Sequence, residues 1–127
     1  MQSHQIKFIS EVIARDIEKK SEDIRNFKIL EIGCGDGSGV MLIKNLLGLI
    51  YKDINFEVYG LDYESESDNV QKVNYNTKNL FKLRNTKDTY PFISNNFDYI
   101  FTNQVIEHIE KFNLFVENSS RVLKKDG

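Results

Sequence analysis

The sequence predicts an α/β domain built on an open, mostly parallel sheet. Apolar runs of strand length alternate with amphipathic segments of helical period, and one strand-to-helix junction, at residues 31–39, is unusually rich in glycine. The 127 residues suffice for one domain with a buried core. Because open parallel sheets bind ligands at the carboxyl ends of their strands, we expect the functional residues just after each predicted strand.

The first half of the chain predicts a leading helix and then a strand, a helix and a second strand. Ser3 can cap a helix that ends near Lys20, with isoleucines at spacings of three and four. Residues 28–32 (KILEI) predict a buried strand, and apolar positions between 41 and 50 predict the next helix. Residues 56–61 (FEVYGL) predict a second strand, which completes a right-handed β-α-β unit.

The second half of the chain predicts two shorter strands and a closing helix. Residues 63–79 are polar and predict a loop with at most one or two helical turns. Residues 80–84 predict a short third strand, and residues 97–102 (FDYIFT) predict a fourth. The remaining residues predict a helix over about 111–124, with Gly127 well placed beyond its end.

Composition and charge narrow the class of protein. The chain has 17 basic and 19 acidic side chains and a formal net charge of −2, so we do not expect nucleic acid as a partner. No apolar run has the length of a membrane span, and the first residues lack a signal-peptide pattern. With a single cysteine, these features predict a cytoplasmic protein without membrane contact. We expect one domain, with residues 1–26 as the leading helix and 27–127 as its α/β core.

The glycine cluster predicts a ligand-binding loop. Four of the seven glycines stand at alternate positions from Gly33 to Gly39. A side chain at Gly33 or Gly35 would keep a ligand away from the backbone, and the start of the next helix offers N–H groups to oxygen atoms. A tight turn alone would need only one glycine, so the repeated glycines favour a loop that binds a ligand. The spacing fits neither a P-loop nor the dinucleotide pattern, whose acid comes about 20 residues on, whereas Asp62 lies 29 residues after Gly33.

Two acids and one cysteine accompany this cluster. Asp62 ends the second predicted strand, where its carboxylate could accept from both hydroxyls of a ribose or could simply be solvated. Glu31 lies inside a predicted strand, where a carboxylate is costly without partners, so it either holds the shape of the loop or contacts the ligand. For Cys34 the backbone matters more than the thiol, because no activating base is identified.

Five motifs follow one another in the core of the chain. They are Glu31-x-Gly33-x-Gly35-x-Gly37, Gly60-Leu-Asp62, residues 90–98 (YPFISNNFD), residues 103–108 (NQVIEH) and residues 121–127 (RVLKKDG). In this order and spacing they resemble the motifs of class I S-adenosylmethionine-dependent methyltransferases of the small-molecule type, over about residues 28–127. The resemblance implies a Rossmann-like sheet and methyl transfer from S-adenosylmethionine to a small-molecule acceptor, with no metal.

The resemblance also implies roles for individual residues. The glycine cluster would bind the methionine portion of the cofactor, Asp62 the ribose hydroxyls, and Tyr63 would pack beside the adenine. Asn103 would lie near the sulfonium. The segment that contacts the adenine amine departs from the family pattern, so Thr86 and Asp88 both stay candidates. The predicted cofactor-binding residues are Glu31, Gly33, Cys34, Gly35, Gly37, Asp62, Tyr63, Asp88 and Asn103.

No catalytic residue is identified. His108 is the one candidate, since a neutral imidazole can take a proton near pH 7. In the family that this chain resembles, however, the Glu-His pair often marks only the start of a helix.

Two other functions remain open at this point. One is a catalytically inactive module that only binds the cofactor, and the other, disfavoured by the glycine spacing, is a NAD-type oxidoreductase domain. The family fold has seven strands in the order 3-2-1-4-5-7-6, of which the sequence carries the first four. We therefore expect a fragment of a longer methyltransferase, truncated before the fifth strand, and the oligomeric state is left undetermined.

Overall fold

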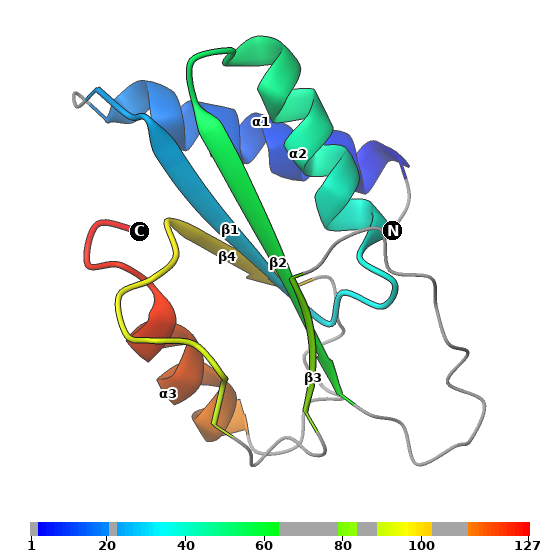
Figure 1. Ribbon diagram of the computed structural model, residues 1–127, viewed down its shortest axis with the longest axis vertical. Helices are drawn as coiled ribbons and strands as arrows, with labels where there is room; N and C mark the ends of the chain where they lie inside the picture. The colour runs from blue at the N-terminus through cyan, green and yellow to red at the C-terminus, as the bar shows by residue number, and fades with distance from the viewer. Residues whose placement is uncertain (1–2, 21–22, 64–78, 84–88, 103–111) are drawn as a thin grey trace.

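The computed structural model describes residues 3–20, 23–63, 79–83, 89–102 and 112–127, and Figure 1 shows how their helices and strands are arranged. Helices alternate with strands after a leading helix, as the sequence predicts. The elements are α1 (Ser3–Lys19), β1 (Asn26–Ile32), α2 (Ser38–Ile50), β2 (Asn55–Tyr63), β3 (Leu80–Leu83), β4 (Tyr99–Thr102) and α3 (Phe112–Val122).

The described strands form one sheet in the order β3-β2-β1-β4, and all neighbouring strands are parallel. β1 pairs with β2 from Asn26↔Asn55 to Ile32↔Leu61, and its other edge pairs with β4. The open parallel sheet and the 3-2-1-4 order are therefore confirmed. The parallel arrangement brings the carboxyl ends of β1 and β2 together at one edge, where the glycine cluster and Asp62 lie.

Each face of the sheet is covered by helices. α1 and α2 lie on one face and α3 on the other (Figure 1). Side chains alternate along β1, so that Phe27 and Ile29 belong to the core beneath α1 and α2, whereas Leu30 and Ile32 belong to the core on the side of α3. By the same alternation Glu31 points toward the α2 face. This places a carboxylate under the start of α2.

The segment before β4 differs from the prediction. β4 begins at Tyr99, two residues later than expected, because Phe97 pairs with the chain that follows α3 instead of with β1. The N–H of Phe97 donates to the carbonyl of Val122 at 2.9 Å, and the N–H of Lys124 donates to the carbonyl of Phe97 at 2.8 Å. These bonds also end α3 at Val122, so the prediction of a helix to residue 124 is wrong by two residues.

The carboxylate of Asp98 joins three segments of the chain. Its Oδ2 accepts from the N–H of Lys28 at 2.8 Å, and its Oδ1 accepts from Nζ of Lys124 at 3.1 Å. The N–H of Asp98 in turn donates to the carbonyl of Lys28 at 2.9 Å. Asp98 therefore fastens the beginning of β1 to the approach to β4 and to the segment after α3.

Two residues of α3 hold the segment that crosses the sheet before β4. The guanidinium of Arg121 donates to the carbonyls of Tyr90 and Phe92 at 2.9 and 2.8 Å. Oδ1 of Asn118 accepts from the N–H of Tyr90 at 3.3 Å. The ring of Phe92 packs edge-on against Phe97, with ring centroids 4.9 Å apart. This segment is thus fixed by both polar and aromatic contacts.

Candidate functional site

The loop between β1 and α2, residues 33–37, is called the glycine loop below. Its three glycines, Gly33, Gly35 and Gly37, have φ angles of 78°, 56° and 78°. These angles lie in the left-handed region, which glycine adopts without the steric cost that other residues meet. The alternating glycines are thus required by the path of the backbone as well as by any ligand that approaches it.

Main-chain bonds attach the glycine loop to β2. The N–H groups of Gly33 and Cys34 both donate to the carbonyl of Leu61, at 2.7 and 3.3 Å. The N–H of Gly37 donates to the carbonyl of Cys34 at 2.9 Å, which closes the turn. The loop is consequently held by the strand that carries Asp62.

Two carboxylates accept further N–H groups of this region. Oδ2 of Asp62 accepts from the N–H of Gly35 at 2.8 Å, across 27 residues of sequence. Oδ1 of Asp36 accepts from the N–H of Ser38, the first residue of α2, at 2.9 Å. The expectation that the start of α2 offers its N–H groups to ligand oxygen atoms is therefore wrong for Ser38, whose N–H donates within the protein. The N–H of Gly35, in the loop before α2, does the same.

Glu31 is the buried acid of the site. Glu31 is only 3% exposed, and its Oε1 is buried without a hydrogen-bond partner among the described residues. Burial raises the pKa of Glu31 to about 7, and the negative charges of Asp62 and Asp36 act in the same direction. A backbone hydrogen bond from Val40 in α2 partly opposes this shift. A buried polar atom that lacks a hydrogen-bond partner among the described residues, such as this Oε1, calls for a functional explanation.

A small cavity of about 200 Å³ opens beside Glu31 and the glycine loop. No lysine, arginine or histidine stands among the described residues that line it, so the polar groups around it are chiefly carboxylates and backbone. The lining residues are Glu31, Gly33, Cys34, Gly35, Asp36, Ser38 and Gly39. Asp36 is not among the predicted site residues, although aspartate commonly accepts from the N–H two residues on in a turn, as it does here from Ser38.

Cys34 is buried between the glycine loop and β2. Burial raises the pKa of its thiol to about 12, with the negative charges of Asp62 and Glu31 adding to the effect. The Sγ lies 3.6 Å from the carbonyl oxygen of Gly35. Because a protonated thiol is a poor nucleophile, this environment supports a packing role for the side chain.

The shifted thiol leads to a prediction about alkylation. In the folded protein at pH 8, Cys34 is expected to react with iodoacetamide on the order of a thousand times more slowly than in the urea-unfolded chain, since the thiolate fraction falls tenfold per pKa unit. Mass spectrometry of timed samples measures both rates. Equal rates in the two states would contradict the buried, protonated thiol.

Several predicted site residues lie outside the described part of the chain. Asp62 is described and is the second-last residue of β2. Tyr63 is the last residue of that strand, but its side chain lies outside the described part. Wholly outside the described part of the chain lie Thr86, Asp88, Asn103 and His108. The structure therefore brings together Glu31, the glycine loop and Asp62, and the roles of the other residues stay predictions.

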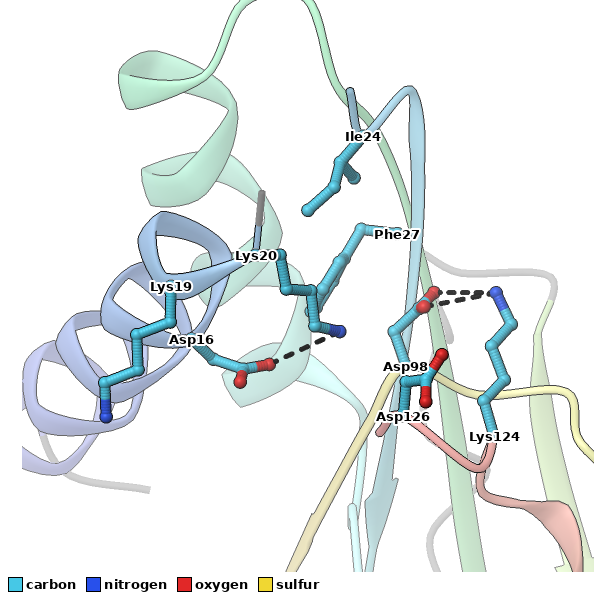
Figure 2. A pocket seen from close by; sticks show the side chains of 8 residues that line it. All are labelled: Asp16, Lys19, Lys20, Ile24, Phe27, Asp98, Lys124 and Asp126. Atoms are coloured by element: carbon cyan, nitrogen blue, oxygen red, sulfur yellow. Dashed lines mark hydrogen bonds and ion pairs between the residues drawn. The ribbon is translucent and has the colours of Figure 1, made fainter. Parts of the chain in front are cut away.

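A larger cavity, of about 530 Å³, lies at the opposite edge of the sheet, near the amino ends of β1 and β4 (Figure 2). Lys20 and Asp16 pair across one side of it at 3.6 Å, and Lys124 pairs with Asp98 at 3.1 Å on the other. Its charged side chains thus largely neutralise one another. The position favours the smaller cavity as the functional site, because ligands of such sheets bind at the carboxyl ends of the strands.

Two kinds of feature are absent from the described residues. Within these residues no three histidine, cysteine, aspartate or glutamate side chains are grouped so that they could hold a metal ion. None of the described helices has both the length and the apolar character needed to cross a membrane.

Comparison with known proteins identifies relatives of this chain. The methyltransferase domain family matches residues 30–127. The ubiquinone biosynthesis O-methyltransferase of Pelagibacter ubique (strain HTCC1062) is 30% identical over 128 residues, which cover 96% of this chain and 49% of that protein. The fatty-acid O-methyltransferase of Mycolicibacterium smegmatis (strain ATCC 700084 / mc(2)155) is 26% identical over 105 residues, covering 83% of this chain and 36% of that protein. The chain spans half or less of the length of these relatives.

A solved structure shares the fold. The YcgJ protein from Bacillus subtilis superposes with a TM-score of 0.63 at 21% sequence identity, over 99% of this chain and 48% of that one. The family match extends from β1 to the last residue given, and it includes the glycine loop and Asp62. The chain therefore belongs to the class I S-adenosylmethionine-dependent methyltransferase family, as its five ordered motifs predicted.

Proposed function

We propose that the glycine loop, Glu31 and Asp62 bind S-adenosylmethionine, and that the protein to which this chain belongs transfers its methyl group to a small-molecule acceptor. The observation that carries the cofactor assignment is the buried Oε1 of Glu31, which has no partner among the described residues and lies beside a cavity that none of their basic side chains lines. S-Adenosylmethionine carries positive charge on its ammonium and sulfonium groups. A carboxylate-lined cavity fits such a cation.

The hydrogen bonds of the glycine loop and of the start of α2 disfavour the NAD-type alternative. A pyrophosphate requires donors at the helix start, yet the N–H of Ser38 already donates to Asp36 and that of Gly35 to Asp62. Two carboxylates beside a phosphate would also repel it. The cavity therefore supports a cationic cofactor over a dinucleotide.

The chemistry of the reaction sets what the protein must do. The sulfonium of the cofactor supplies an already activated methyl group, so the enzyme mainly binds and orients donor and acceptor and excludes water. In our proposal, Asp62 binds the ribose hydroxyls while its bond to Gly35 keeps the glycine loop in place. The predicted contacts of Tyr63, Asp88 and Asn103 complete the cofactor site, with Thr86 as the alternative at the adenine edge, and His108 is the candidate base.

The names of the two curated relatives bear on the acceptor. Both are O-methyltransferases, one of ubiquinone biosynthesis and one of fatty acids. These names support an oxygen atom of a small, largely apolar molecule as the methyl acceptor of this protein. The net charge of −2 supports such an acceptor over nucleic acid, and the buried single cysteine suits the cytoplasmic location that we propose.

Calorimetric titration tests the cofactor assignment directly. S-Adenosylmethionine and S-adenosylhomocysteine are expected to bind, whereas NAD is not. Tight binding of NAD without any response to S-adenosylhomocysteine would overturn the assignment. Turnover with a panel of small acceptors then distinguishes an active enzyme from an inactive cofactor-binding module.

Replacement of Asp62 provides a sharper test of the site. Asp62→Ala is expected to weaken binding of S-adenosylmethionine by about 2–3 kcal/mol, because it removes charge-assisted bonds to the ribose and the acceptor of the Gly35 N–H. Asp62→Asn is expected to lose less, since its carbonyl oxygen can still accept from Gly35. Asp53→Asn, an exposed charge removed from the turn before β2, serves as the matched control. An affinity for Asp62→Ala within twofold of the parent contradicts the ribose role.

A further inference from the structure

We propose that Glu31 releases a proton to solvent when S-adenosylmethionine binds, so that cofactor binding is coupled to the ionisation of this buried carboxyl group. The coupling rests on the proposed function, because it requires the cofactor to occupy the cavity beside the glycine loop. It goes beyond the proposed function because the carboxyl group of Glu31 carries more proton in the free protein than in the complex.

The geometry of Glu31 is the first support for this coupling. The residue is 3% exposed, faces the start of α2, and lines the cavity of about 200 Å³. Its Oε1 has no hydrogen-bond partner among the described residues, so an ionised Glu31 would leave part of its charge buried and uncompensated. A proton on the carboxyl group removes that cost while the cavity holds no cation.

The charges around Glu31 are the second support. Asp62 from β2 and Asp36 from the glycine loop oppose its ionisation, and the thiol of Cys34 is the other titratable group of the loop. The first turn of α2 (Ser38 to Met41) contains no charged side chain, and β1 pairs Glu31 with Phe101 of the uncharged β4. Among the described residues, the backbone bond from Val40 favours the ionised form, and burial outweighs it.

A cation placed in the cavity reverses this balance. With a pKa of about 7, Glu31 is about half protonated at pH 7 in the free protein. The positive charge of the cofactor favours the ionised carboxylate and lowers its pKa in the complex. By linkage, affinity rises with pH through the pKa of the free form and is expected to be about tenfold weaker at pH 6 than at pH 8.

Titration calorimetry of the parent chain and of Glu31→Gln tests the coupling. Heats of S-adenosylmethionine binding at pH 7, measured in phosphate and in Tris, give the number of protons released. We expect the parent to release about half a proton more than Glu31→Gln, whose affinity should also lack the tenfold rise between pH 6 and pH 8. Glu11→Gln removes an exposed glutamate of α1 and is the matched control, with the behaviour of the parent.

A second measurement needs no variant and no cofactor. The carboxyl carbon of Glu31 is followed by NMR in the free parent protein, where a midpoint near pH 7 is expected. A midpoint near the ordinary glutamate value of 4.5 overturns the coupling even if the cofactor binds. Equal proton release by the parent and Glu31→Gln also overturns it and leaves the proposed function standing. If S-adenosylmethionine does not bind to the parent at any pH from 6 to 8, the proposed function is refuted, and the coupling with it.

Discussion

Replacement of Gly35 by valine is expected to abolish detectable binding of S-adenosylmethionine, a loss of at least about a hundredfold, while the sheet stays folded. A Cβ added at Gly35 meets no protein atom within 4 Å, so the valine side chain would enter the open space beside the glycine loop, where we place the cofactor. The φ of 56° adds backbone strain of about 1–2 kcal/mol for a residue with a side chain. Most of the effect should therefore fall on the ligand.

The same substitution at Gly48 is the matched control for Gly35→Val. A Cβ at Gly48 also meets nothing within 4 Å, but this glycine lies near the end of α2, away from the loop. Gly48→Val is expected to bind the cofactor like the parent. Circular dichroism and thermal melting must accompany the calorimetry. A folded Gly35→Val with unchanged affinity would show that the loop does not contact the cofactor.

Replacement of Gly60 by valine is expected to destabilise the fold by about 3 kcal/mol, the upper part of the range for overpacking a core. Gly60 lies in β2, and a Cβ there would stand 2.5 Å from the Sγ and 2.9 Å from the Cβ of Cys34, and would collide with Leu80 of β3 as well. The short side chain of Cys34 cannot move aside without the glycine loop. Relief therefore requires a shift of that loop or of β3.

Chemical denaturation measures the free energy of unfolding for this variant. Gly48→Ala is the control, because an alanine in an exposed helix position with free space should stabilise the protein by about 0.5–1 kcal/mol. Opposite signs for the two glycine substitutions are the expected result. A Gly60→Val variant as stable as the parent would contradict the close contact between β2 and the glycine loop.

The sequence predicts the sheet better than the limits of its strands. Apolar runs and the glycine cluster suffice for four parallel strands, because a buried strand needs apolar side chains on both faces. The extension of β2 to Tyr63 depends instead on its pairing with β3, where Asp62 aligns with Lys82 and Tyr63 with Leu83. Such a register joins residues that are distant in sequence. Local patterns do not encode it.

The same distinction applies to the candidate site. The alternation of Gly33, Gly35 and Gly37 predicts a ligand-binding loop, on the ground that a tight turn alone needs one glycine. The φ angles show instead that the backbone itself requires all three glycines. Which acceptors take the N–H groups could not be predicted, because the bond from Gly35 to Asp62 forms only when β2 lies beside β1. The prediction of free donors at the start of α2 fails for Ser38 because its N–H donates to Asp36. The unpartnered oxygen of Glu31 likewise depends on how α2 covers the end of β1.

The attachment of Asp98 to Lys28 bears on the entropy of folding. β1 and β4 pair across 70 residues of sequence, as in Ile29↔Tyr99, whereas β1 and β2 pair across 29. In the loop-closure relation, which grows with the logarithm of loop length, the longer closure costs about 0.8 kcal/mol more. Asp98 accepts from the main chain at the start of β1 and from Lys124, and so contributes bonds at the point where the long loop closes. The β1–β4 pair therefore raises the contact order of this fold, and one carboxylate helps to offset the chain entropy that this pairing loses.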